Sequence, residues 1–162
     1  MNYATFGDEK LNIMDVTLTV NKEEVYKEVA QTTSYTGAKM DDDVNAYERI
    51  STVDEDQPEL ERFWNESRAE VAQTFIRMLT EEKMEGDQYH LTLDVSVSFD
   101  KALLPSMQLG LFSYFVQSIT AKWYVFTNKK EAGDFADRGS AILEEVKEKA
   151  FFKKRPTRPT YN

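Results

Sequence analysis

The chain has 162 residues, of which 41% are hydrophobic, and its formal net charge is −9 at pH 7. A chain of this length buries about 70% of the surface that it exposes when unfolded, so one packed domain is expected. The absence of cysteine excludes disulfides, thiol nucleophiles and cysteine-ligated metals. The excess of acid disfavours nucleic-acid binding as the main task.

The N-terminal part predicts a strand followed by a helix. Over residues 13–20 apolar side chains alternate with polar ones, which is typical of a strand with one solvated face. Asn21 and Glu24 have the spacing of a capping box, so we expect a helix over residues 22–35 that ends near Gly37.

The connection over residues 36–56 carries two acidic clusters. They are Asp41, Asp42 and Asp43, and Asp54, Glu55 and Asp56. From Asp41 the sequence starts like an EF-hand calcium loop, but Ala46 stands where glycine is required and Thr52 stands where the bidentate glutamate is required. We therefore interpret the clusters as solvated loops with helix-capping acids. Incidental binding of a divalent ion is the alternative.

Residues 57–84 predict one long amphipathic helix, because Asp56 and Glu59 repeat the capping-box spacing. Residues 89–99 alternate between apolar and polar side chains and predict a second strand. Its expected partner is the segment 13–20, in a two-stranded antiparallel ribbon. Two strands alone are marginal in water, so this ribbon is expected to pack on the helices or on another subunit.

The stretch 102–126 is the segment around which the rest is expected to pack. It has no charge until Lys122, and its apolar residues fall on more than one helical face, which predicts a central buried helix. Its many hydrogen-bonding side chains disfavour a membrane span. Asn128 and Glu131 again have the capping-box spacing, before a last helix that runs antiparallel to the central one.

Pro156 and Pro159 end regular structure, so residues 1–152 are expected to form a single domain and residues 153–162 an extended basic tail. The predicted fold class is α+β and mostly helical. About four helices bundle around residues 102–126, beside the ribbon of 13–20 and 89–99. Phe151 and Phe152 are interpreted, like the other large aromatics, as core residues.

No residue pattern indicates catalysis. His90 stands alone on the solvated face of a strand, and the six glycines are scattered rather than arranged to cradle a phosphate. We therefore predict a protein that is not an enzyme, with no catalytic, cofactor-binding or metal-binding residues. A hydrolase with paired acids is an alternative, and it requires a deep pocket lined by carboxylates with raised pKa values.

The tail contains four basic residues and no acid: Lys153, Lys154, Arg155 and Arg158. One interpretation is a disordered, solubilising end. The other is an arm that docks on the acidic clusters 41–43 and 54–56 of an identical subunit. Such a head-to-tail contact closes into a ring if the rotation between subunits allows it.

The C-terminal part resembles a group of small proteins from tailed phages and prophages of Bacteroidetes-type bacteria. The resemblance rests on Leu103-Leu104-Pro105, on Ala121-Lys122-Trp123-Tyr124, on Phe135 and Ala136, and on Lys153-Lys154-Arg155-Pro156-Thr157-Arg158-Pro159. It implies a structural virion protein that is assembled in the host bacterial cytoplasm.

Within the virion, the resemblance implies a head–tail connector subunit of the neck or adaptor type. Its expected partners are copies of itself in a ring, the portal, and other neck or tail proteins. DNA is expected only as cargo that passes through the ring without specific binding, and no membrane partner is expected. The alternatives are another tail-completion or portal-adaptor protein, or a non-catalytic protein-binding module.

Overall fold

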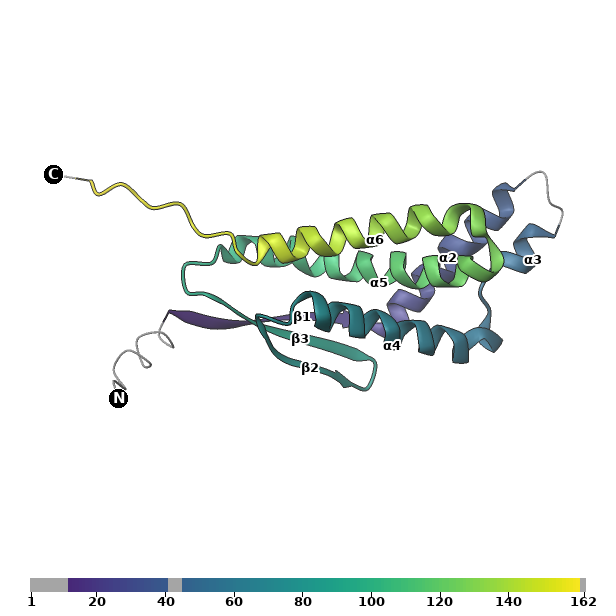
Figure 1. The fold of residues 1–162 in the computed structure, drawn as a ribbon, viewed down its shortest axis with the longest axis horizontal. Coiled ribbons are helices and arrows are strands. Elements are labelled where there is room, and N and C mark those ends of the chain that lie inside the picture. Colours follow the sequence, from purple (N-terminus) through teal and green to yellow (C-terminus); the bar gives the residue numbers. More distant parts are fainter. Residues whose placement is uncertain (1–11, 41–44, 161–162) are drawn as a thin grey trace.

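The computed structural model describes residues 12–40 and 45–160 and has an elongated shape (Figure 1). The elements follow one another in this order: β1 (Ile13–Asn21), α2 (Lys22–Lys39), α3 (Ala46–Ile50), the 3-10 turn η1 (Asp54–Asp56), α4 (Gln57–Thr74), β2 (Leu79–Glu85), β3 (Gln88–Ser96), the 3-10 turn η2 (Lys101–Leu103), α5 (Leu104–Thr127) and α6 (Lys129–Lys149). The predicted α+β class with a mostly helical chain is therefore confirmed.

The sheet is antiparallel, with strand order β1-β3-β2. The predicted pairing of β1 with β3 is confirmed, and its register places Val16 opposite Leu93. The predicted ribbon was incomplete, however, because β2 adds a third strand on the other side of β3. β2 and β3 are joined by a tight turn at Gly86, whose φ of 59° is a left-handed conformation that glycine adopts without strain.

The predicted helix over residues 57–84 was wrong in its last part, since α4 ends at Thr74. Phe75 and Met78 are buried, but the following residues 79–85 alternate irregularly and include no fully buried side chain. A helix there would bury little apolar surface, whereas an edge strand gains the backbone hydrogen bonds of β3. Local helix propensity therefore yields to sheet pairing.

The central position of α5 is confirmed. It packs along α6 and also contacts α2, α4 and β1. Its Gln108 side chain accepts a hydrogen bond of 2.8 Å from the backbone N–H of Thr19, which ties the outer edge of β1 to the helix. Three large apolar residues of the stretch are nevertheless exposed, Leu109 by 66%, Val125 by 49% and Phe126 by 72%.

Helix α6 packs tightly against α5 at Gly110. A Cβ atom added there would lie 2.6 Å from Cγ2 of Val146, so a larger residue fits only if the Val146 side chain or α6 shifts. At Gly139, where the sequence also allows a close approach, an added Cβ would lie 3.4 Å from Cβ of Gln117. Gly110 of α5 therefore leaves less room for a side chain than Gly139 of α6 does.

Within the described ranges, no helix combines the length and the apolar character that crossing a membrane requires.

Candidate functional site

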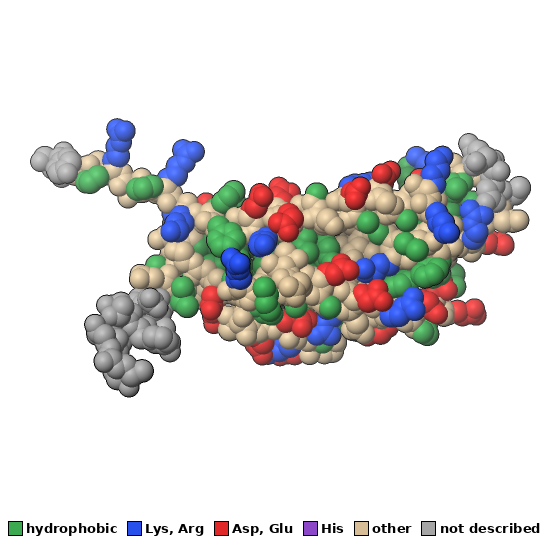
Figure 2. Space-filling view, in the orientation of Figure 1, with side chains coloured by type: hydrophobic (Ala, Val, Ile, Leu, Met, Phe, Trp, Pro, Cys, Tyr) green, Lys and Arg blue, Asp and Glu red, His purple; other side chains and the backbone are tan. Residues whose placement is uncertain are grey.

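The basic tail leaves the body at the end where α5 begins. Lys153 forms a β-bridge with Phe99, and the backbone N–H of Lys154 donates a 2.8 Å hydrogen bond to the carbonyl of Ser98. Beyond this anchor, the described tail residues are exposed and extended (Figures 1 and 2). All four predicted basic site residues, Lys153, Lys154, Arg155 and Arg158, are exposed in this segment.

Of the two acidic clusters, the second is placed by the structure. Asp54, Glu55 and Asp56 form η1, directly before α4, and a side-chain oxygen of Asp56 accepts a 2.7 Å hydrogen bond from the N–H of Val53. Asp54 and Glu55 are exposed. The first cluster, Asp41, Asp42 and Asp43, lies outside the described residues.

The tail and η1 lie at opposite ends of the helical body (Figure 1). α4 runs antiparallel to α5, so η1, which directly precedes α4, lies near the end of α5. The tail lies near the start of α5. The 24 residues of α5 span about 36 Å at 1.5 Å per residue. Arg158, the last of the four basic residues, lies five residues beyond the anchored Lys153, so its backbone reaches at most about 18 Å from that anchor. The four basic residues therefore cannot reach along the body to η1 of their own chain.

Two exposed aromatic residues mark the base of the tail, which corrects the expectation that they belong to the core. Phe151 is 64% exposed and Phe152 is 52% exposed. Their backbone is nevertheless held: Phe152 donates to the carbonyl of Lys149 and accepts from the N–H of Asp100, both at 3.1 Å. Their position in the sequence, between the end of the last helix and the basic run, is the signal that could have predicted this exposure.

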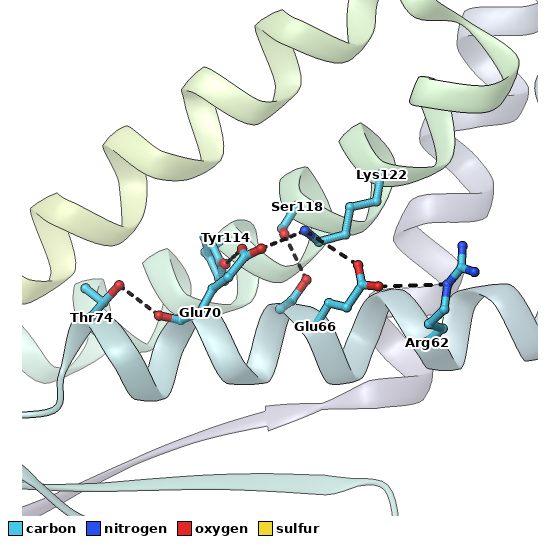
Figure 3. Close-up of polar contacts among 8 residues, drawn as sticks. Arg62, Glu66, Glu70, Thr74, Tyr114, Ser118 and Lys122 are labelled. Carbon is cyan, nitrogen blue, oxygen red and sulfur yellow. Dashed lines mark hydrogen bonds and ion pairs between the residues drawn. The ribbon is translucent and has the colours of Figure 1, made fainter.

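A cleft of about 440 Å³ lies between α4, α5 and α6. Small residues of α6, including Ala132, Gly133 and Ala136, form one wall, and Tyr114 and Lys122 contribute from α5. Glu70 contributes from α4. The polar side of this cleft is shown in Figure 3.

Glu70 is the centre of the polar contacts. It accepts a hydrogen bond of 2.7 Å from Nζ of Lys122 and another from the hydroxyl of Tyr114. Lys122 also lies 3.9 Å from Glu66, and the hydroxyls of Ser67 and Ser118 share a buried hydrogen bond of 2.8 Å (Figure 3). This network was missed from the sequence, although Lys122 is the single charge of the central stretch.

The network fixes the ionisation of its members. Partial burial acts to raise the pKa of Glu70, but the hydrogen bonds from Lys122 and Tyr114 outweigh it and leave the pKa below its usual value. Burial, together with the hydrogen bond to Glu70, raises the pKa of Tyr114. Glu70 is therefore a firmly ionised carboxylate, which is the opposite of the raised-pKa acid that the hydrolase alternative requires.

A raised carboxyl pKa does occur on the sheet. Asp15 of β1 and Asp94 of β3 are direct cross-strand partners. The hydrogen bond to Asp94, with smaller contributions from desolvation and charge repulsion, raises the pKa of Asp15. This pair lies on the solvated face of the sheet, away from the residues that line the cleft.

In residues 12–40 and 45–160, no group of three or more His, Asp or Glu side chains could hold a metal ion. His90 lies 3.4 Å from a carboxylate oxygen of Glu85, as a surface contact of the β2–β3 hairpin. The EF-hand-like start at Asp41 falls outside the described residues.

Comparison of the chain with protein-family models, with curated proteins and with solved structures finds no match.

Proposed function

We propose that this protein is a structural assembly subunit that binds copies of itself head to tail, in the role of a phage head–tail connector. One observation carries the proposal: the extended basic tail and the acidic η1 lie at opposite ends of one elongated body. Because the tail cannot reach η1 of its own chain, the complementary partner available to it is η1 of another copy.

A contact between different surfaces of identical subunits propagates, and it closes into a ring if the rotation between neighbours divides a full turn. Opposite charges at the two ends steer this encounter and select its orientation. A subunit with a net charge of −9 also presents DNA with a channel wall of like charge, which repels the phosphates so that DNA passes without being held.

In this role the partners are further copies of the chain, the portal, and other neck or tail proteins. The place of action is the virion, after assembly in the host cytoplasm. A tail-completion or portal-adaptor role uses the same head-to-tail chemistry and differs in which neighbour the ring meets.

Assembly is tested by light scattering and by electron microscopy of the purified protein, alone and mixed with portal rings. We expect rings or larger species that disappear when residues 153–162 are deleted or when salt is raised, since exposed charges are screened by salt. A deletion variant that keeps its fold and its assembly would overturn the proposal and favour a binding module for another protein.

Charge reversal gives a sharper test. Arg155→Glu in the tail should weaken assembly, whereas Arg138→Glu, an equal change of charge on exposed α6, should leave it intact. Adding Asp54→Lys and Glu55→Lys to a tail variant with Lys154→Glu and Arg155→Glu should restore assembly if the two ends meet. If the combined variant is folded but does not assemble, the tail binds a site other than η1.

A further inference from the structure

We infer that Phe151 and Phe152 are the apolar anchors of the head-to-tail contact, and that they enter a hollow between α2 and η1 of a second copy. This inference rests on the proposed function and specifies its interface. It names the side chains that enter and the site that receives them.

The anchor side is built for insertion. Phe151 and Phe152 project from a backbone that is hydrogen-bonded to Lys149 and Asp100, so little further ordering is required on binding. Aromatic side chains held in this way are typical of residues that dominate binding energy at protein interfaces. Lys153 follows Phe152 directly, so positive charge adjoins the aromatic pair.

The receiving side is a hollow of about 340 Å³ at the other end of the body. Its apolar lining comes from Ala30 of α2, from Val53 before η1, and from Leu60 of α4. Two acids, Glu23 and Asp54, and one base, Lys27, also line it. An aromatic ring inside the hollow would therefore bring the adjoining cations close to carboxylates.

The charges distinguish this hollow from the larger cleft beside Glu70. In that cleft, the carboxylate of Glu70 is already paired with Lys122, so an incoming basic segment would meet a neutralised partner. In the hollow, the two lining acids are joined by the neighbouring exposed Glu55, so that acids outnumber the one lining cation, Lys27. The combination of an apolar lining with acids at its edge matches an aromatic pair followed by lysines and arginine.

The absence of cysteine from the chain allows a direct test by disulfide trapping. One preparation carries Lys153→Cys and a second carries Val53→Cys, and the two are mixed under oxidising conditions. We expect a disulfide-linked dimer of the two variants. The matched control replaces Val53→Cys by Arg138→Cys, which is also exposed and should cross-link at least about tenfold less.

A second test shortens the two aromatic side chains or fills the hollow that receives them. The double variant Phe151→Ala/Phe152→Ala should weaken association at least about tenfold, whereas Leu109→Ala, which removes an exposed apolar residue elsewhere, should change it less than about twofold. Ala30→Trp should fill the hollow and weaken association to a similar degree. Circular dichroism and thermal melting establish that each variant is folded.

The outcomes separate this inference from the proposed function. Assembly that depends on the tail charges, but is unchanged in Phe151→Ala/Phe152→Ala and gives no cross-link between positions 153 and 53, overturns the inference and leaves the proposed function standing. A wild-type protein that stays monomeric over the whole concentration series and with portal rings overturns both.

Discussion

The indole of Trp64 stacks on the ring of Phe115, with ring centroids 4.3 Å apart and an interplanar angle of 23°. This contact joins α4 to the central helix α5, and Tyr89 of β3 meets both rings edge-on. Three elements that are distant in sequence thus share one aromatic cluster. The cluster holds strand β3 against helices α4 and α5.

Removal of either stacked ring should be costly. Trp64→Ala or Phe115→Ala is expected to lower the free energy of unfolding by about 3–5 kcal/mol, because both side chains are buried and leave a large cavity. Urea unfolding followed by circular dichroism measures the change. Phe126→Ala, on an exposed ring of the same helix, should stay within about 0.5 kcal/mol. Equal losses for all three variants would contradict the assigned core.

Gly110 and Gly133 should respond in opposite directions to the same substitution. Gly110→Ala forces a Cβ atom against Val146 and is expected to cost about 1–3 kcal/mol. Gly133→Ala meets no atom within 4 Å, so it should stabilise α6 by about 0.5–1 kcal/mol through helix propensity. Thermal melts measure both, and Val146→Ala should partly rescue Gly110→Ala. A stabilising effect at Gly110 would contradict the close contact of α5 with α6.

Glu70 should make the fold sensitive to acid. Its pKa in the folded state is lowered, so its contribution to stability is present above its unfolded pKa of about 4.5 and is lost as pH falls through the folded value. Urea unfolding between about pH 7 and about pH 3 should therefore show a smaller loss of stability in Glu70→Gln than in the wild type. Glu148→Gln, an exposed acid on α6, serves as the control, and identical acid profiles for both variants would refute this role of the network.

Asp15 should act in the opposite sense. Its pKa is raised by Asp94, so the folded state takes up a proton before the unfolded state as pH falls. Stability from this pair therefore increases as pH drops through the raised value toward about 3.8, and it is lowest when both carboxylates are charged. Asp94→Asn should raise the melting temperature at neutral pH, and an unchanged or lower melting temperature would contradict repulsion between the two.

The sequence predicted the elements whose patterns are regular. The alternation over 89–99 and 13–20 identified the paired strands, and the uncharged stretch 102–126 identified the central helix, since burial selects apolar residues with the period of the element. The third strand was missed because residues 79–85 pair through their backbone, and side-chain alternation carries no signal of that pairing. The aromatic residues Phe151 and Phe152 were misjudged for a related reason: composition does not reveal which rings a neighbouring helix leaves uncovered.

The amino-acid order by itself thus determined the fold class, the central helix, and a tail that is basic and contains two prolines. The tertiary structure alone decided that Lys122 pairs with Glu70, and that the tail and η1 lie at opposite ends of the body. Both relationships depend on α4 running antiparallel to α5. That arrangement follows from the packing of Trp64 on Phe115 and from the buried hydroxyl pair of Ser67 and Ser118, which are long-range contacts that no local pattern encodes.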